Sequence, residues 1–298
     1  MKKTMLITGA NGFIGKNLVD YFNNIYDVST LSRTGDEINN LKIDLTDEKQ
    51  VEKNKDLIST FDVVIHCAAN SNPKLDEQNY NQIFRDNVES THNLVRCLNK
   101  NQSLVFMSSI LVYNENGKEY PQNIYGITKY SCEQIINYYS KQIEFSYCNF
   151  RLSACVGEKY TTHGMLHDFL NRAKNNNSKD FNVLGTYPGA IKPYVHINDV
   201  CKNIDLICSI MTLYNFYVGY TFDLFPTDYL SVEDIAKVIL KEFSLDKEIV
   251  FSNNDYKGDQ KKLQINPNNL TLLKYTSRQA IEKVVRAYLL LKEEKNEN

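Results

Sequence analysis

The stretch Thr8-Gly9-Ala10-Asn11-Gly12-Phe13-Ile14-Gly15 decides the fold of this chain. It follows an apolar run, Thr4–Thr8, that predicts a short buried strand, and apolar residues with helical spacing, Leu18 and Phe22, come after it. Its three glycines permit a tight turn and a close backbone approach to a pyrophosphate, and the amino end of the helix supplies amide donors and positive potential. The order of strand, glycine turn and helix therefore predicts a dinucleotide site.

Strand and helix signals go on alternating through the first half of the chain. Further strands are predicted at residues 27–31, 41–43, 62–67 and 103–107, with helical spacing between them, as at residues 79–99. This alternation predicts an α/β fold with a doubly wound parallel sheet of the Rossmann type. Ligands of such sheets bind beyond the carboxyl ends of the strands, so the residues directly after each strand are the candidates for function.

The regular alternation stops near Gly157. We predict a dinucleotide-binding domain of residues 1–156, to which residues 194–215 return, beginning with a strand at Tyr194–Ile197. Residues 157–193 and 216–298 then form a smaller α/β substrate-binding region at the carboxyl end.

Composition excludes several classes of partner. The 298 residues hold 34 Lys and Arg against 36 Asp and Glu, so no overall field attracts nucleic acid or a membrane surface. The first apolar run is too short for a signal peptide, and the seven cysteines include no Cys-x-x-Cys pair, which favours reduced thiols in a cytoplasmic protein. His163 and His167 share a helical spacing but have no evident third ligand, so no metal is expected.

The end of the second predicted strand indicates which dinucleotide binds. A carboxylate there accepts from the ribose hydroxyls of NAD, whereas a cation receives the 2′-phosphate of NADP. Here Ser32 and Arg33 stand at that point, which favours NADP(H) and leaves NAD(H) as the alternative, with Arg33 then only a solvated side chain. Asp44 follows the third strand, where it either accepts from the adenine amino group or caps the helix that begins near Thr46.

Three further residues suggest a proton-transfer site. Tyr125 and Lys129 lie four residues apart at the start of a predicted helix and so share a face. A nearby cation helps a phenol exchange a proton with a substrate alcohol or ketone. Ser109 lies just beyond the predicted strand 103–107. Its hydroxyl there either binds the same substrate oxygen or only satisfies a strand-end amide. In a chain with 20 tyrosines the Tyr–Lys spacing alone is weak, but with Ser109 and the glycine turn it indicates catalysis.

These motifs together resemble the extended short-chain dehydrogenase/reductase family, which includes nucleotide-sugar epimerases, dehydratases and 4-ketoreductases. The ordered parallels are TGANGFIG (8–15), DL (44–45), VIHCAA (64–69), NV (87–88), SSILVY (108–113), YGITK (125–129), FRL (150–152) and YVHINDV (194–200). The resemblance covers most of the chain and implies an NAD(P)-dependent oxidoreductase or epimerase that acts on a nucleotide-linked sugar, with a homodimer as the family's usual state.

The resemblance also implies roles for individual residues. The catalytic residues are Ser109, Tyr125 and Lys129. The residues expected to bind the cofactor are Gly9, Asn11, Gly12, Phe13, Ile14, Gly15, Ser32, Arg33, Asp44, Leu45, Cys67, Ala68, Ala69, Asn87, Tyr125 and Lys129. The residues expected to bind the substrate are Asn70, Ser109, Ile110, Lys192 and Lys257. In this comparison Arg151 and His196 have supporting roles.

Departures from the family pattern narrow the reaction. Ile110 and Leu111 replace the Asp-Glu pair that dehydratases use as extra acid and base, which argues against a dehydratase. Lys192 and Lys257 stand where sugar-diphosphate binders often carry arginine. Net reductases of the family draw on NADPH and Arg33 favours NADP(H), so we expect NADPH-dependent reduction of a 4-keto nucleotide deoxysugar. A nucleotide-sugar 4-epimerase is the alternative, and a non-catalytic NADP-binding sensor is a remote one.

Overall fold

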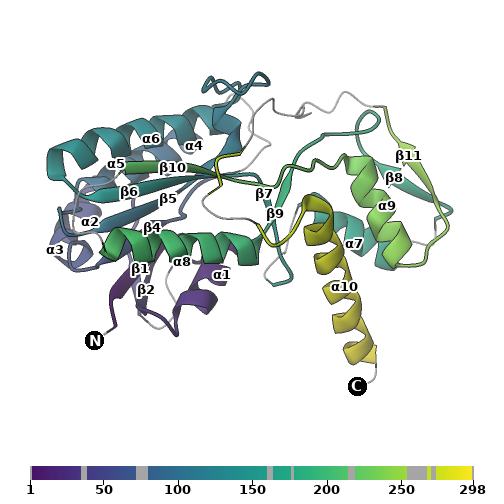
Figure 1. The fold of residues 1–298 in the computed structure, drawn as a ribbon, viewed down its shortest axis with the longest axis horizontal. Helices are drawn as coiled ribbons and strands as arrows, with labels where there is room; N and C mark the ends of the chain where they lie inside the picture. Colours follow the sequence, from purple (N-terminus) through teal and green to yellow (C-terminus); the bar gives the residue numbers. More distant parts are fainter. Residues whose placement is uncertain are drawn as a thin grey trace. The chain divides into compact units, whose positions relative to one another are not determined.

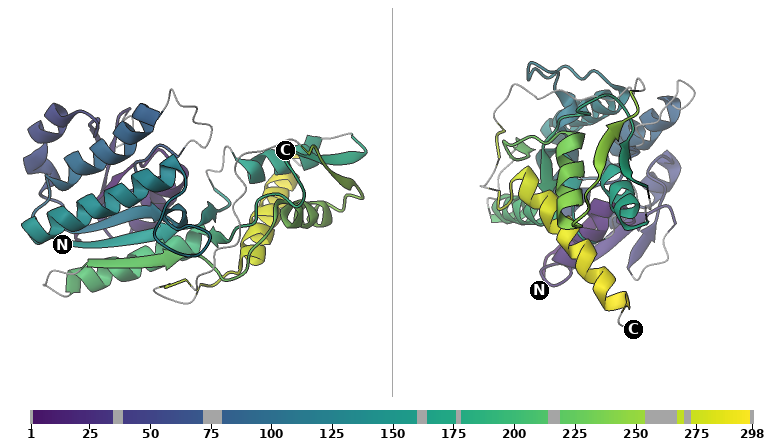
Figure 2. Two further views of the ribbon diagram at one scale, coloured as in Figure 1. Left: turned by 90° about the horizontal axis from the view of Figure 1, so that it is seen from above. Right: turned by 90° about the vertical axis from the view of Figure 1, so that its right-hand side faces the viewer.

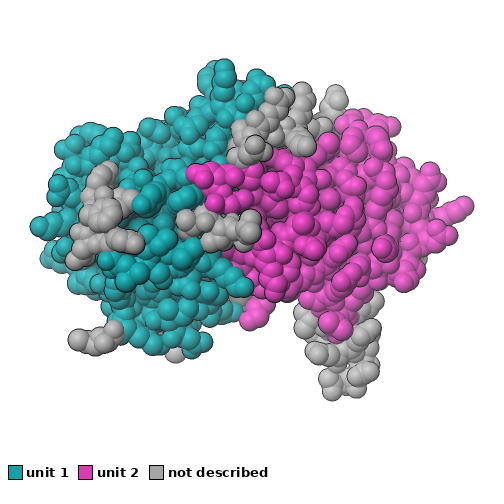
Figure 3. All heavy atoms as spheres, in the orientation of Figure 1, with its two compact units in different colours: residues 1–152, 201–224 teal, residues 153–200, 225–298 magenta. Residues whose placement is uncertain are grey.

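The computed structural model describes residues 2–34, 39–71, 80–159, 164–175, 178–213, 219–253, 267–269 and 273–296. The chain divides into two compact units, coloured separately in Figure 3. Unit 1 comprises residues 1–152 and 201–224, and unit 2 comprises residues 153–200 and 225–298. No helix within the described ranges is long and apolar enough to cross a membrane.

A seven-stranded sheet lies at the centre of unit 1. Its strands are β1 (Thr4–Thr8), β2 (Asp27–Ser32), β3 (Asn40–Lys42), β4 (Val63–His66), β5 (Ser103–Ser109), β6 (Ser146–Leu152) and β10 (Gly219–Leu224). Their order is β10-β6-β5-β4-β1-β2-β3, and every neighbouring pair is parallel. The predicted doubly wound α/β sheet is confirmed, and the carboxyl ends of its strands lie at one edge.

Helices cover both faces of this sheet (Figures 1 and 2). One face carries α6 (Ile124–Ile143) and the shorter α2 (Glu48–Lys53), α3 (Lys55–Ile58), α4 (Tyr80–Phe84) and α5 (Ser90–Val95). The other face carries α1 (Phe13–Phe22) and α8 (Ile197–Leu213), which begins in unit 2. Because β4 and β5 are covered on both sides, every residue of both strands is buried, which explains their continuous apolar runs.

Unit 2 has its own apolar core. Its elements are β7 (Ala154–Val156), α7 (Met165–Asn175), β8 (Asp180–Val183), β9 (Tyr194–His196), α9 (Val232–Glu242), β11 (Glu248–Phe251) and α10 (Ser277–Asn296). β7 pairs with β9 and β8 pairs with β11, both in parallel. The helices α9 and α10 pack together (Figures 1 and 2), and Phe169, Phe181, Ile235 and Ile281 contribute to one buried cluster.

Two expected chain paths differ from the structure. The sequence predicts that the strand at Tyr194–Ile197 returns to the dinucleotide-binding domain, but β9 pairs with β7 in unit 2. Residues 219–224 were placed in the substrate region, but they form β10 at the edge of the main sheet, beside β6. A strand pattern does not reveal its pairing partner, because the alternation of side chains depends on burial and not on which strand lies beside it.

Candidate functional site

The glycine turn fits its neighbours so closely that two of its glycines have no room for a side chain. A Cβ on Gly9, whose φ is +67°, would lie 2.6 Å from the Ala68 amide nitrogen. A Cβ on Gly15 would lie 2.3 Å from the Gly9 carbonyl oxygen. The first contact lets the residues after β4 approach the turn, and the second lets α1 pack against it.

The third glycine leaves room for a ligand, and the turn fits a pyrophosphate. A Cβ on Gly12 would meet only the Gly9 carbonyl, at 3.3 Å, and Gly12 itself is exposed. Gly12 is the N-cap of α1, and the first turn of that helix contains no acidic residue. The first amides of a helix have no partner within the helix, so their hydrogens and positive potential are suited to an anion.

A cation and a carboxylate meet beyond the end of β2. The Arg33 guanidinium, 64% exposed, has Nη1 3.8 Å from Oδ1 of Asp86, whose side chain is 13% exposed. Asp86 also accepts hydrogen bonds from Nδ2 of Asn70 at 2.9 Å and Nε2 of Gln82 at 2.8 Å. Sequence reasoning missed Asp86 because it lies in a π-helical turn (Arg85–Glu89), far along the chain from Arg33.

The side chains near Arg33 are also engaged with one another. Ser32 Oγ donates to Oδ1 of Asn40 at 3.1 Å, and Nδ2 of Asn11 donates to Oγ1 of Thr34 at 3.3 Å. Ser32 therefore braces β2 against β3, while the side chain that extends from this strand end is Arg33.

Asp44 and Leu45, after β3, lie in a tight local turn. Oδ1 of Asp44 accepts from the amide and the hydroxyl of Thr46, at 2.9 and 2.8 Å. The N-cap of α2 is Asp47, so the expectation that Asp44 caps this helix is wrong. Leu45 is 5% exposed and packs in the core of unit 1.

Asn87 is buried and fastens the segment after β4 to helix α6. Its Oδ1 accepts from the Asn70 amide at 2.6 Å, and its Nδ2 donates to the Asn70 carbonyl at 3.1 Å and to Oγ1 of Thr128 at 3.0 Å. These bonds use both amide hydrogens, so Asn87 shapes the cofactor side of the sheet through Asn70. Cys67 and Ala68, directly after β4, are half-buried, and Ala69 is exposed.

His66 is a buried residue that sequence reasoning did not single out. Its Nδ1 lies 2.7 Å from Oγ1 of Thr8, and its Nε2 lies 3.0 Å from Oγ1 of Thr91. Thr91 donates its own hydrogen to the Asn87 carbonyl, and Thr8 accepts from the Ala68 amide. The network therefore assigns the ring hydrogen to Nε2 and a neutral imidazole, and burial lowers the pKa of His66 to about 3.

Ser109, Tyr125 and Lys129 belong to β5 and α6, which pack against each other. Lys129 is 2% exposed, its Nζ donates to the Met107 carbonyl at 2.7 Å, and it lies 5.7 Å from the centre of the Tyr125 ring. Ser109, at the end of β5, accepts from the Leu111 amide at 3.2 Å. A hydroxyl that accepts one bond can still donate its hydrogen, so this contact fits both readings of Ser109.

Gly126 explains how the helix carrying Tyr125 comes so near to β5. A Cβ on Gly126 would lie 2.2 Å from the Leu111 carbonyl oxygen, so only glycine lets the first turn of α6 touch the segment after Ser109. Asn123 caps the helix by accepting from the Gly126 amide at 2.8 Å. The glycine within Tyr125–Lys129 was the available sequence signal for this contact.

The expected substrate residues are placed as follows. Ile110 follows Ser109 directly and is 5% exposed. Lys192 lies in unit 2, where its backbone pairs with Leu230, its Nζ is 5.6 Å from the centre of the Tyr194 ring, and burial lowers its pKa. Lys257 and His163 lie outside the described residues.

Comparisons with known proteins identify the family of this chain. A model of the NAD dependent epimerase/dehydratase family matches residues 5–211. The chain belongs to this family. This epimerase/dehydratase-family protein is 29% identical over 219 residues to a putative UDP-glucose 4-epimerase of Methanocaldococcus jannaschii, covering 66% of the chain and 71% of the relative.

Two further similarities extend over more of the chain. A dTDP-4-dehydro-6-deoxyglucose reductase of Escherichia coli is 23% identical over 299 residues, covering 91% of this chain and 89% of the relative. A UDP-glucuronic acid 4-epimerase of Bacillus cereus, solved with UDP-glucuronic acid and NAD, has a TM-score of 0.78 and 17% identity, covering 97% of this chain and 99% of that structure. The protein is an enzyme of the extended short-chain dehydrogenase/reductase type, in a family that uses a nicotinamide dinucleotide.

Proposed function

We propose that this enzyme reduces the keto carbon, C4, of a nucleotide-linked deoxysugar with NADPH, and that Ser109, Tyr125 and Lys129 are its catalytic residues. The observation that carries the proposal is the packing of the Tyr125–Lys129 face of α6 against the end of β5, which Gly126 makes possible. Unit 1 then binds the dinucleotide, and Lys192 is a proposed ligand of the sugar nucleotide.

The residues of the chain handle the proton while the dinucleotide, when bound, supplies the hydride. As the ketone carbon gains hydride, negative charge develops on its oxygen. Tyr125 gives that oxygen its phenolic proton, and Ser109 donates a hydrogen bond to it. Lys129 has three N–H hydrogens, of which one is held by Met107, so the others can bind the cofactor ribose and stabilise the charge left on Tyr125.

The choice of NADPH rests on Arg33. Its guanidinium is mostly exposed beyond β2, where it can receive a 2′-phosphate, and Ser32 and Thr34 beside it offer no carboxylate for the ribose hydroxyls of NAD. The turn at Gly9–Gly15 holds the pyrophosphate in this proposal, with Gly12 next to it.

A 4-epimerase is the second candidate, and one contact favours it. Asp86 lies beside Arg33 and competes with a 2′-phosphate for the guanidinium, which would favour NAD. The same three residues would then move the proton of the sugar hydroxyl, while bound NAD would take hydride from one carbon and return it to the opposite face of that carbon, without net consumption of the dinucleotide. A homodimer stays a prediction of the family resemblance, and a cytoplasmic location stays a prediction from the cysteine pattern.

Titration of the purified protein with NADPH and with NADH, followed by a hydride-consumption screen against 4-keto nucleotide sugars generated in place, tests the proposal. NADPH-selective binding with one equivalent consumed per substrate is the expected result. Retained NAD with sugar interconversion and no net consumption would establish the epimerase instead.

A matched pair of variants tests the catalytic assignment. Tyr125→Phe should lower turnover by about 10²- to 10⁴-fold, the usual value of a positioned acid. Tyr138→Phe, on the same helix but 61% exposed, should leave it unchanged. Retained turnover in Tyr125→Phe would remove Tyr125 from the mechanism, and biological output without any turnover would favour the sensor.

A further inference from the structure

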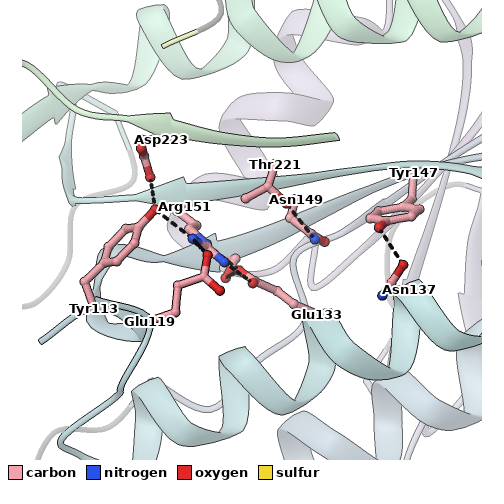
Figure 4. A network of polar contacts seen from close by, with 10 residues as sticks. Tyr113, Glu119, Glu133, Asn137, Tyr147, Asn149, Arg151, Thr221 and Asp223 are labelled. Atoms are coloured by element: carbon pink, nitrogen blue, oxygen red, sulfur yellow. Dashed lines mark hydrogen bonds and ion pairs between the residues drawn. The ribbon is translucent and has the colours of Figure 1, made fainter. Parts of the chain in front are cut away.

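A buried group of charged and hydroxyl side chains lies one helical turn beyond Lys129 and takes no part in the proposed proton transfer (Figure 4). We call it the Arg151 cluster; its members are Ser108, Tyr113, Glu119, Glu133, Arg151 and Asp223. At its centre, Nε and Nη2 of Arg151 donate to the two oxygens of Glu133 at 3.0 and 2.6 Å. The side chains of Arg151 and Glu133 are 5% and 3% exposed, so this is a buried bidentate pair.

The remaining nitrogen of Arg151 faces the segment that joins Ser109 to Tyr125. Nη1 donates to Oη of Tyr113 at 2.7 Å and to Oε1 of Glu119 at 2.6 Å (Figure 4). The Tyr113 hydroxyl in turn donates to Oδ1 of Asp223 on β10 at 2.8 Å. Burial, with the Asp223 charge adding to it, raises the pKa of Tyr113, so this hydroxyl stays a donor.

The cluster also reaches the strand that carries Ser109. Ser108 Oγ, directly before Ser109, donates to Oε1 of Glu133 at 2.5 Å. Glu133 lies on α6, one turn after Lys129 and two after Tyr125. The cluster therefore joins the end of β5, the connecting segment and the catalytic helix through hydrogen bonds with one guanidinium and its carboxylate.

We infer that Arg151 is a positioning residue, which fixes the Ser109 hydroxyl relative to the Tyr125 phenol. The inference rests on the proposed function. Five N–H hydrogens in one rigid plane let Arg151 serve Glu133, Tyr113 and Glu119 together, which the point charge of a lysine does not. Burial alone would lower the pKa of Arg151, but its bonds and charge interaction with Glu133 raise it, so the guanidinium stays charged.

The effect on catalysis follows from geometry. If the bonds from Nη1 are lost, the segment 110–124 keeps its covalent ends and the bond from Tyr113 to Asp223 on β10, but it loses its hydrogen bonds to Arg151 on β6 and, through Arg151, its link to Glu133 on α6. A small displacement between a catalytic acid and its hydrogen-bonding partner lowers turnover strongly, by up to about 100-fold for 1 Å, without changing how the dinucleotide binds in the glycine turn.

Tyr113→Phe tests this inference, because it removes only the hydroxyl that bridges Arg151 and Asp223. Tyr120→Phe on the same segment is the matched control, since Tyr120 is 67% exposed. Hydrogen–deuterium exchange in the presence of NADPH should be faster at residues 109–119 in Tyr113→Phe but not in Tyr120→Phe, with exchange at residues 2–34 unchanged in both. Turnover should fall about 10- to 100-fold, with unchanged Kd for NADPH.

Glu119→Gln provides a second variant that keeps the fold, because the Glu119 side chain is 48% exposed and the charge it loses is not buried. It should reproduce both changes in weaker form. Normal exchange at residues 109–119 in both variants, or faster exchange spread evenly over unit 1, would overturn the inference. If the wild-type enzyme consumes no hydride with any sugar nucleotide, the proposed function fails, and the exchange comparison still decides whether Arg151 anchors the segment.

Discussion

The glycine turn and the Arg151 cluster both lie near the carboxyl ends of the strands in unit 1. The residues of the turn are neighbours in the sequence, whereas those of the cluster are far apart in it. The turn is built from consecutive residues 8–15, and it works by leaving side chains out: a Cβ on Gly9 or Gly15 would meet backbone at 2.6 or 2.3 Å. The cluster is built from side chains on β5, α6, β6, β10 and the segment between β5 and α6, and Tyr113 and Asp223 are 110 residues apart.

The two regions therefore fail in different ways. Removing either charge of the Arg151–Glu133 pair leaves the other buried and unpaired, which costs more than an isolated hydrogen bond is worth. Adding a methyl group to the turn forces strand, helix and the segment after β4 apart. The largest losses of unfolding free energy are therefore expected where a substitution removes a buried charge from the cluster or adds a methyl group at a crowded glycine of the turn.

Replacement of Arg151 by methionine should have the largest effect on stability. Glu133 would stay buried without its cation, and breaking such a pair costs about 3–5 kcal/mol of unfolding free energy. Urea denaturation at neutral pH measures this. The double variant Arg151→Met/Glu133→Met should recover part of the loss, since no buried charge remains; a single variant within about 1 kcal/mol of wild type would contradict the account.

Gly15→Ala should destabilise the protein by about 1–3 kcal/mol, because its new methyl group overlaps the Gly9 carbonyl. Gly12→Ala is the matched variant, with a Cβ contact of 3.3 Å and an exposed position. It should keep most of the stability yet weaken NADPH binding, since the methyl group takes the space of the phosphate. Urea denaturation and NADPH titration of both variants would separate packing from binding; equal stability losses would refute this distinction.

His66, which links Thr8 of the turn to α5, should make stability depend on acid pH. Burial holds the pKa of His66 at about 3, below its ordinary 6.5, so the unfolded chain binds one more proton between these values. Unfolding free energy should fall as pH decreases below 6.5, by up to about 1.4 kcal/mol per unit from this residue. The pH dependence of urea unfolding, compared with His66→Gln, measures this share; an identical slope in the variant would exclude His66 as its source.

Asp86→Asn should have the smallest effect, a change in NADPH affinity, because it removes only the carboxylate that contacts Arg33. The Arg33–Asp86 contact is 3.8 Å long and Arg33 is 64% exposed, so its removal changes binding by about 0.2–1 kcal/mol, or roughly 1.4- to 5-fold. NADPH should bind more tightly, because its 2′-phosphate no longer competes with the carboxylate, while the Kd for NADH stays constant. Weaker NADPH binding in the variant would show that Asp86 does not oppose the phosphate.

Sequence reasoning reached furthest where function depends on neighbouring residues. The turn at 8–15 is recognisable because glycine spacing, a strand before it and a helix after it are all local patterns. The predicted sheet and family are confirmed, and both were recognisable from such local patterns. Tyr125 and Lys129 share a helix face because residues four apart lie on the same side of a helix. Ser109, Tyr125 and Lys129 as catalysts stay a prediction that rests on this spacing.

Only the tertiary structure decided which distant residues meet. β9 and β10 exchanged their expected sheets, and Asp86 came to lie beside Arg33, because strand pairing and helix packing choose partners that no short sequence window contains. Arg151 reads in the sequence as one buried arginine on a strand, and its three partners, Glu133, Tyr113 and Glu119, become visible only when β6, α6 and the segment between β5 and α6 are assembled. The sequence by itself thus determined the glycine turn, which depends on neighbouring residues. The charged partners of Arg33 and Arg151 were decided only by the tertiary structure, because they come from elements that the packing of the whole sheet brings together.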